Sequence, residues 1–380
     1  MVEPRGREGM SRRSFLKVGA AGAAAVSGTV CAEAPKAADT LAYRTLGRTG
    51  LKITAVSMGA FQTSEQAVFE AAFDLGINYV DTARNYVGGK SERLLGKALK
   101  ASDKKVYVAT KVWLDDKAKM LQDLETSLSE LMLDCVDVLF LHKCDAREEI
   151  FDEDNRAVMK HARDNGKARF LGVSTHDNTI EVINAVIEDP EKLFDVILVT
   201  YSFKSGDDIK QAIARAAEAG LGVIAMKTQA GGYKTKELGD INPHQAALRW
   251  VLQDPSITAA IPSMANLQQV QEDVAVMGMP MTSTDVATLK RYGDAIAPFF
   301  CHHCGACRLT CAKHIDIPSI NRCLMYAEGY GDARIAGAAF AEIPLEASLR
   351  ACADCAECTA RCAHGLDLGE RLRTATAFFA

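Results

Sequence analysis

Short apolar runs rich in β-forming residues alternate with helical stretches from about residue 42 to residue 277. Eight such runs can be counted, and they read VSMGA, NYVDT, VYVAT, VDVLFLH, RFLGVS, DVILVT, GVIAMK and ITAAIPS. Strict alternation of strands and helices is typical of a parallel sheet. Eight units in roughly 240 residues fit a closed (β/α)8 barrel, and an open doubly wound sheet is the alternative. We therefore predict an α/β fold with a TIM barrel over residues 40–297.

Polar side chains stand at the carboxyl ends of three predicted strands, in the segments DTARNY, TKVW and FLHK. They include Asp81, Tyr86, Lys111 and His142. Chemistry in a TIM barrel takes place at this end of the strands, so we expect these side chains to form a catalytic group. Tyr86 would donate a proton to a carbonyl oxygen, and the Lys111 ammonium would lower the pKa of this tyrosine. Asp81 would hold the lysine, and His142 would orient the carbonyl and stabilise developing negative charge.

The same side chains lie in longer motifs, namely LGRTG, DTARNYVGGKSERLLGKAL, VATKVW and SLSELMLDCVDVLFLHK. These motifs resemble the aldo/keto reductase family over the whole central domain. The resemblance matches the family's catalytic Asp, Tyr, Lys and His to Asp81, Tyr86, Lys111 and His142, and its substrate-side Trp to Trp113. It implies a barrel enzyme that reduces aldehydes or ketones with NADPH or NADH.

The resemblance also indicates where a nicotinamide cofactor would bind, and here the chain departs from the family pattern. The family's Ser is Ser174 and an adenine-side acid is Glu272, whereas Met226 replaces the aromatic ring that stacks on the nicotinamide. The Lys and Arg that usually bind the adenosine phosphate fall on Ser263 and Gln269. Losing each cation removes a charge-assisted bond of about 1.5 to 3 kcal/mol. Binding of NAD(P)H is therefore implied, but a preference for NADPH is not.

Eight of the twelve cysteines lie in two runs, CHHCGACRLTC at 301–311 and CADCAECTARC at 352–362. Both runs have the spacing C-x2-C-x2-C-x3-C, and such close spacing brings thiolates toward one centre rather than pairing them across a fold. Disulfides, the usual use of many cysteines in an exported protein, are disfavoured for this reason. Zinc sites usually use two separated C-x2-C pairs, so zinc is the less favoured metal and iron–sulfur ligation is favoured.

This double run resembles the two-cluster ferredoxins, in which the fourth cysteine of each run binds the cluster of the other run. The resemblance assigns two 4Fe–4S clusters, one held by Cys301, Cys304, Cys307 and Cys362 and the other by Cys352, Cys355, Cys358 and Cys311. The intervening residues 312–351 have a helical composition. Residues 298–380 are therefore predicted to form a small, mostly α-helical ferredoxin-like domain.

The first 34 residues resemble a twin-arginine signal peptide. Arg12 and Arg13 in SRRSFLK precede a mild apolar run, VGAAGAAAVSGTV, and a small-residue stretch at Ala32–Ala34 that is typical of a cleavage site. Such signals direct folded, cofactor-loaded proteins across the bacterial inner membrane, which predicts a periplasmic location. No later segment approaches eighteen consecutive apolar residues, so no transmembrane segment is expected after the signal. The formal net charge of -5 gives no reason to expect a nucleic-acid partner.

Two hypotheses about function follow from these features. The first is an exported oxidoreductase that acts on a small-molecule carbonyl or alcohol and exchanges electrons with a redox partner protein through two 4Fe–4S clusters. The second is a non-catalytic electron-transfer or docking subunit whose barrel no longer binds nicotinamide. The second is motivated by the departures from the family's cofactor pattern at Thr175, Leu198, Ser263 and Gln269.

Overall fold

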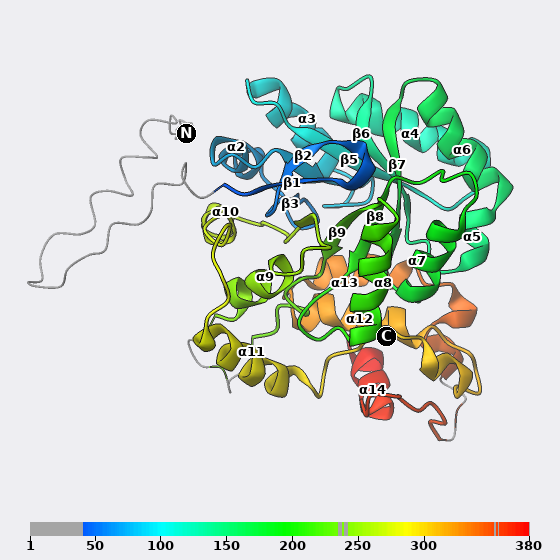
Figure 1. Ribbon diagram of the computed structural model, residues 1–380. Coiled ribbons are helices and arrows are strands. Elements are labelled where there is room, and N and C mark those ends of the chain that lie inside the picture. Colours follow the sequence, from blue (N-terminus) through cyan, green and yellow to red (C-terminus); the bar gives the residue numbers. More distant parts are fainter. Residues whose placement is uncertain (1–40, 235–237, 239–241, 353–354, 356, 380) are drawn as a thin grey trace, which may run out of the picture. The chain divides into compact units, whose positions relative to one another are not determined.

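The computed structural model describes residues 41–234, 238, 242–352, 355 and 357–379 (Figure 1). In this part of the chain, eight strands form a single sheet in the order β3 to β10, and every neighbouring pair is parallel. Val56 bridges Ala260 and Gly59 bridges Ser263, both in parallel, so the last strand returns to the first. The predicted (β/α)8 barrel is confirmed, and the open sheet is excluded.

The strands of the barrel coincide with the eight runs expected from the sequence. Their bounds are β3 Met58–Gly59, β4 Tyr79–Asp81, β5 Tyr107–Trp113, β6 Val136–His142, β7 Ala168–Thr175, β8 Val196–Thr200, β9 Gly222–Met226 and β10 Ala259–Ala260. The long central strands β5 to β7 are buried on both faces, which explains their nearly continuous apolar sequences.

Helices on the outside of the sheet pack their apolar faces against the strands (Figure 1). Side chains such as Phe69, Leu124 and Ile183 are fully buried in this outer core. The helices are α2 Gln66–Asp74, α3 Ser91–Ala101, α4 Lys117–Leu131, α5 Arg147–Phe151, α6 Glu153–Asp164, α7 Thr179–Glu188, α8 Asp207–Glu218, α9 His244–Leu252, α10 Leu267–Val274 and α11 Ser283–Ile296.

A short antiparallel hairpin, β1 Tyr43–Thr45 and β2 Lys52–Thr54, precedes the barrel and was not predicted. Its apolar side chains Leu46, Leu51 and Ile53 join the cluster inside the barrel, together with Tyr79 and Phe140. The hairpin therefore closes the barrel interior at the end opposite to the expected active site.

The cysteine-rich segment after the barrel is helical, with α12 Ile317–Glu328, α13 Ala333–Ala341 and α14 Leu368–Phe379. Short 3-10 turns, Ala306–Leu309 and Leu349–Cys352, lie within or beside the two cysteine runs. The helical composition predicted for residues 312–351 is thus confirmed by α12 and α13. One hydrophobic cluster lies within this segment, and another joins Tyr326 and Ile335 to the barrel loop residues Ala230 and Tyr233.

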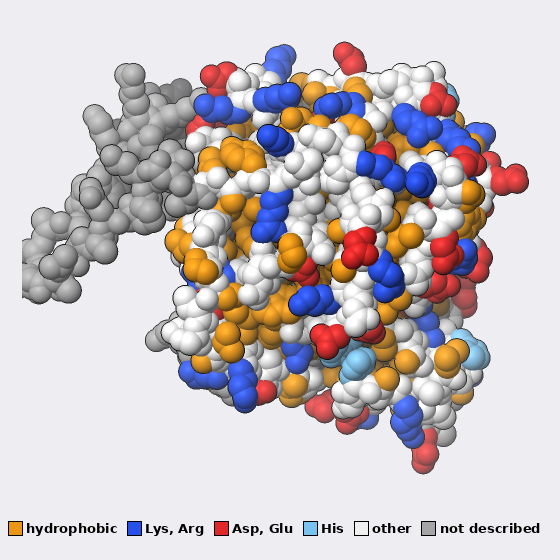
Figure 2. Space-filling view, viewed as in Figure 1, with side chains coloured by type: hydrophobic (Ala, Val, Ile, Leu, Met, Phe, Trp, Pro, Cys, Tyr) orange, Lys and Arg blue, Asp and Glu red, His pale blue; other side chains and the backbone are white. Residues whose placement is uncertain are grey.

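The predicted signal, residues 1–34, lies outside the described residues. Among the described helices, none is both long and apolar enough to cross a membrane. Lys and Arg side chains are interspersed with Asp and Glu over the face shown in Figure 2.

The end of α12 lies directly against a barrel loop. A Cβ atom on Gly329 would stand 2.0 Å from the carbonyl oxygen of Gly231, so a side chain at this position cannot be accommodated without moving the helix. In contrast, a Cβ atom on Gly337 of α13 would meet nothing within 4 Å.

We expect Gly329→Ala to destabilise the protein by about 1 to 3 kcal/mol, because α12 must move away from the barrel loop. The matched control Gly337→Ala should instead be neutral or stabilise by about 0.5 to 1 kcal/mol, because alanine is the better helix former and has room. Urea denaturation followed by circular dichroism measures both. Identical midpoints for the two variants would contradict the close approach of α12 to the barrel.

Candidate active site

Two of the predicted catalytic residues form a buried ion pair at the carboxyl end of the barrel. Asp81 ends β4 and Lys111 lies in β5, and their side chains are only 2% and 1% exposed. Lys111 Nζ donates to Asp81 Oδ1 and, over 2.7 Å, to the carbonyl oxygen of Thr82. Burial raises the pKa of Asp81 and lowers that of Lys111, and the bond between them opposes both shifts.

Tyr86 and His142 lie beside this ion pair. The Tyr86 ring centroid is 4.9 Å from Lys111 Nζ and 6.2 Å from the His142 ring centroid. The structure therefore brings together all four side chains that the sequence singled out as catalytic. The centroids of the Trp113 and His142 rings are 4.3 Å apart.

The loop that carries Tyr86 is held by a buried carboxylate that the sequence did not single out. Glu92, in the first turn of α3, accepts a hydrogen bond of 2.6 Å from Thr110 Oγ1 and one of 2.9 Å from Arg84 Nη1. The backbone N–H of Tyr86 donates to the carbonyl oxygen of Ala83 over 3.2 Å, which closes a tight turn. The sequence pattern that could have indicated this role is an acidic residue, Glu92, on the helix face that otherwise carries buried apolar residues such as Leu95.

The pKa of Tyr86 is raised well above its usual value, so the predicted lowering is wrong. Burial disfavours the phenolate, and the Asp81 carboxylate and the nearby Tyr326 and Tyr330 hydroxyls add to this effect. These effects outweigh the opposing influence of the Lys111 ammonium, which is paired with Asp81. Tyr86 therefore keeps its proton at neutral pH, as a proton donor must.

His142 is neutral at physiological pH. Burial lowers its pKa well below the usual value, and the positive charges of Lys111, Lys143, Lys227 and Arg322 lower it further. A neutral imidazole still offers one N–H donor, which suits a group that orients a carbonyl oxygen.

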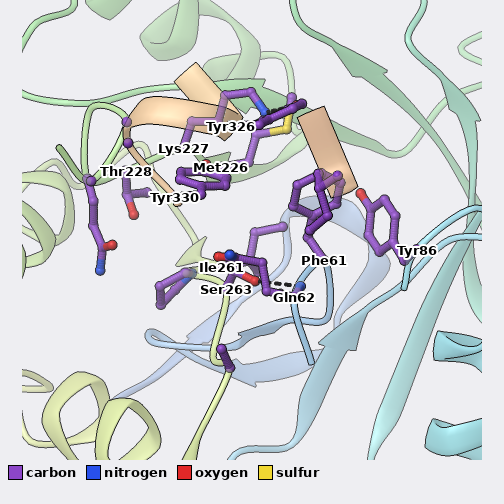
Figure 3. Close-up of a pocket in the computed structure, with 18 of the residues that line it drawn as sticks. Phe61, Gln62, Tyr86, Met226, Lys227, Thr228, Ile261, Ser263, Tyr326 and Tyr330 are labelled. Atoms are coloured by element: carbon purple, nitrogen blue, oxygen red, sulfur yellow. Dashed lines mark hydrogen bonds between the residues drawn. The ribbon is translucent and has the colours of Figure 1, made fainter. Parts of the chain in front are cut away.

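A cavity of about 870 Å³ opens over these groups, within the size range of cofactor sites. Tyr86, His142 and Trp113 line it, and so do three of the predicted cofactor positions, Met226, Ser263 and Glu272. Figure 3 shows Met226 and Ser263 reaching the cavity from β9 and from the segment after β10. Ser263 Oγ accepts a hydrogen bond of 2.9 Å from the backbone N–H of Gln62, and Glu272 accepts one of 2.6 Å from Gln268.

Ser174, the remaining predicted cofactor residue, is not among the residues that line the cavity. Its hydroxyl accepts a hydrogen bond of 3.0 Å from the Lys143 backbone N–H and donates one of 3.3 Å to the Leu141 carbonyl oxygen. It therefore joins β7 to the end of β6 behind the cavity wall. The neighbouring Thr175 hydroxyl donates to Asp145 over 3.1 Å, and Leu198 is buried inside the barrel.

The sequence model described as the aldo/keto reductase family matches residues 56–245, half of the 380 residues. The chain belongs to the aldo/keto reductase family. It is accordingly an oxidoreductase, and it carries a twin-arginine translocation signal sequence that matches residues 9–28.

This aldo/keto reductase is 29% identical over 306 residues to the L-galactose dehydrogenase of Arabidopsis thaliana. The alignment covers 67% of this chain and 94% of that protein. The holo form of the aldo-keto reductase AKR11C1 from Bacillus halodurans is 21% identical with a TM-score of 0.56, covering 66% of this chain and 96% of that one. An aldo-keto reductase from Klebsiella pneumoniae in complex with NADPH is 23% identical with a TM-score of 0.56. That superposition covers 66% of this chain and 95% of the Klebsiella chain. These structures share the barrel fold.

The family match ends before the cysteine-rich segment, and in this aldo/keto reductase that segment covers the active site. Tyr326 lies 5.1 Å and Tyr330 6.3 Å from the ring of Phe61, which itself is 5.0 Å from the Tyr86 ring. Tyr326 Oη also accepts a hydrogen bond of 3.1 Å from Lys227 Nζ (Figure 3). These contacts were not predicted, because Tyr326 and Tyr330 lie more than 90 residues along the chain from the barrel residues that they meet.

A buried carboxylate next to the active site joins the barrel to the cysteine-rich segment. Asp177, directly after β7, is 1% exposed and forms ion pairs with His303 (3.3 Å), Arg308 (3.4 Å) and Arg322 (3.7 Å). Burial opposes ionisation of this carboxyl, but the contacts with His303 and Arg322 lower its pKa to about 2. Asp177 is therefore ionised, and its three partners, the guanidinium groups of Arg308 and Arg322 and the His303 ring, all come from the cysteine-rich segment.

Electrostatic interactions link the eight predicted cluster cysteines in two groups of four. Burial raises the pKa of Cys301 to about 12, and the thiols of Cys307 and Cys362 contribute to this shift. Cys307 is influenced in the same way by Cys304 and Cys362. In the second group, burial raises the pKa of Cys352 to about 11, with contributions from the thiols of Cys355, Cys311 and Cys358.

Hydrogen bonds hold the two cysteine runs side by side. Thr359 Oγ1 donates to the Thr310 carbonyl oxygen over 2.9 Å, and the Arg361 backbone N–H donates to Thr310 Oγ1 over 2.8 Å. These bonds pair the residue just before Cys311 with two residues that lie between Cys358 and Cys362. Two sulfur atoms also accept backbone N–H bonds, Cys301 from His303 (3.4 Å) and Cys362 from His364 (3.3 Å).

The cysteines of the described residues form no disulfide bonds. Within the same residues, no three His, Cys, Asp or Glu side chains are placed to hold a metal ion.

We expect Asp81→Asn to destabilise this aldo/keto reductase by about 3 to 5 kcal/mol, because it leaves the Lys111 ammonium buried without a counter-charge. Chemical denaturation measures the loss. The double variant Asp81→Leu with Lys111→Met should recover most of the stability, because it buries no charge, and yet remain inactive. Full stability of Asp81→Asn alone would contradict a buried ion pair.

Proposed function

We propose that this protein is an exported iron–sulfur oxidoreductase that interconverts a carbonyl compound and an alcohol. Electrons would pass between two 4Fe–4S clusters and a partner protein. One observation carries the proposal: four catalytic side chains meet at the mouth of a barrel that a cysteine-rich segment covers.

The residues of the chain supply proton transfer and charge stabilisation. A bound NAD(P)H would provide the hydride. Tyr86, which holds its proton, would donate it to the carbonyl oxygen, and the Lys111 ammonium 4.9 Å from its ring would stabilise the phenolate left behind. The neutral His142 would donate a hydrogen bond to the same oxygen and so favour the developing alkoxide. The aromatic cover of Phe61, Tyr326 and Tyr330 would exclude water.

The cavity suits a nicotinamide dinucleotide but gives no reason for a preference for NADPH. Its volume of about 870 Å³ and the acid Glu272 support binding of an adenine dinucleotide. Ser263 and Gln269 stand where the family's phosphate-binding cations would be, and both side chains instead bind backbone N–H groups, those of Gln62 and Ala265. NADH is therefore the better-supported cofactor.

The two groups of cysteines suit two clusters better than they suit single ions. The proposed ligand set of each cluster takes three thiols from one run and the fourth from the other, as in a two-cluster ferredoxin. The same four thiols influence one another electrostatically. The backbone N–H donors to Cys301 and Cys362 are the kind of bond that tunes a cluster's potential. The signal at residues 9–28 supports export of the folded, loaded protein to the periplasm.

Replacing Tyr86 by Phe tests the catalytic assignment. Turnover should fall by about 100-fold or more, because the proton donor is lost, while nucleotide affinity should hold. The assay would follow NADH oxidation with a panel of aldehydes, and NAD⁺ reduction with L-galactose, which the Arabidopsis relative's name suggests. Tyr107→Phe, a partly buried tyrosine at the other end of β5, is the matched control and should keep full activity. Wild-type turnover by the Tyr86 variant would refute the assignment.

Metal analysis tests the cluster assignment. Anaerobically reconstituted protein should contain about eight iron atoms per chain, and Cys304→Ser should lower this toward about four. Electron paramagnetic resonance of the reduced wild type should show the signals of two interacting clusters, and Cys304→Ser should lose one of them. Cys135→Ser, outside both runs, is the control and should change neither readout. Stoichiometric zinc without iron, or disulfides in the isolated protein, would overturn the assignment.

A further inference from the structure

One end of the cavity carries cations that the proposed proton transfer does not use. Lys143, Lys227 and Arg322 all line the cavity, and all three contribute to lowering the pKa of His142. They therefore lie at the catalytic end, whereas Ser263 and Glu272 reach the cavity after β10.

Arg322 is buried with part of its hydrogen-bonding capacity unmet. The residue is 6% exposed, and Nη2 donates to Ser319 Oγ over 2.8 Å. Nη1 is 3.7 Å from Asp177 Oδ2, beyond hydrogen-bond distance, and has no hydrogen-bond partner within the described residues. Leaving a guanidinium donor unmet in a buried site is costly, which indicates that a ligand completes the site.

Lys227 converges on the same place from the barrel. Its Nζ donates to Tyr326 Oη over 3.1 Å, and Tyr326 lies one helical turn after Arg322 on α12. Among the described residues, no carboxylate forms an ion pair with Lys227. Burial and the neighbouring Arg322 lower the pKa of Lys227 to about 7, a shift that a bound anion would reverse. The next residue, Thr228, is 2% exposed, and its hydroxyl also lacks a partner within the described chain.

We propose that Lys227 and Arg322 bind the carboxylate of an oxo-acid or hydroxy-acid substrate and hold its reacting carbon beside Tyr86 and His142. The inference rests on the proposed function and adds the class of substrate. A guanidinium matches the planar carboxylate, and Lys227 supplies a second charge from the opposite wall. Because Arg322 belongs to α12, beyond the family match at residues 56–245, the cysteine-rich segment itself selects the substrate.

Equilibrium binding of a matched pair of ketones tests this proposal. Phenylglyoxylate and its methyl ester differ in the negative charge, and pyruvate with methyl pyruvate forms a smaller pair. Calorimetry on the full, anaerobically prepared protein should show the acids binding at least about 10-fold tighter than the esters. Lys227→Met and Arg322→Gln should each weaken acid binding by about 10- to 100-fold and leave ester binding unchanged. Arg373→Gln, an exposed arginine on α14, is the control and should change neither.

Several outcomes would overturn the proposal. They are equal affinity for acid and ester, no binding of either acid, or variants that weaken NADH binding and leave acid binding intact. The last would assign the cations to the dinucleotide pyrophosphate. If a melting curve shows that Arg322→Gln does not fold, the affinity of Lys227→Met for the acids alone tests the carboxylate site.

Acid binding that survives in Tyr86→Phe supports the carboxylate site even where turnover is absent. The carboxylate site and the proposed catalytic function can therefore fail separately.

Discussion

The Asp177 carboxylate is the contact on which the arrangement of this protein depends. It is fully enclosed near the end of a barrel strand, yet its partners Arg308, Arg322 and His303 come from the cysteine-rich segment. A buried charge of this kind is tolerated only when it is paired, so the barrel alone leaves the Asp177 carboxylate without its counter-charges. Arg322 shows the consequence, because the residue that pairs with Asp177 also lines the cavity. Docking of the segment and completion of the site are one event.

Features that repeat along the chain could be predicted, whereas features that depend on distant contacts could not. The eight strands follow from local alternation, and Asp81, Lys111 and His142 follow from the ends of those strands. The pKa of Tyr86 was predicted in the wrong direction, because its surroundings include Tyr326 and Tyr330, about 240 residues further along the chain. The hairpin β1–β2 was missed because strands of three residues carry too little pattern.

In the cysteine runs too, local features could be predicted and contacts between distant residues could not. Spacing within each run is local and predicts the kind of metal centre, whereas the bonds between Thr310 and the second run join residues about 50 positions apart. The first run also contacts the barrel. His303 contacts Asp177 and donates its backbone N–H to Cys301, and Asp177 follows His176, whose ring is 6.5 Å from that of His142. A series of neighbouring residues therefore connects His142 with the first cysteine run.

The position of α12 in the sequence sets the order in which the site can form. All barrel strands precede Ile261, so a growing chain has made the catalytic side chains before Arg322 and Tyr326 emerge from the ribosome. Until then the barrel mouth is open to water and Asp177 has none of its partners. The site of the proposed function is thus complete only when the cysteine-rich segment has folded onto the barrel. Under the proposed export of a folded protein, only chains with a complete site would cross the membrane.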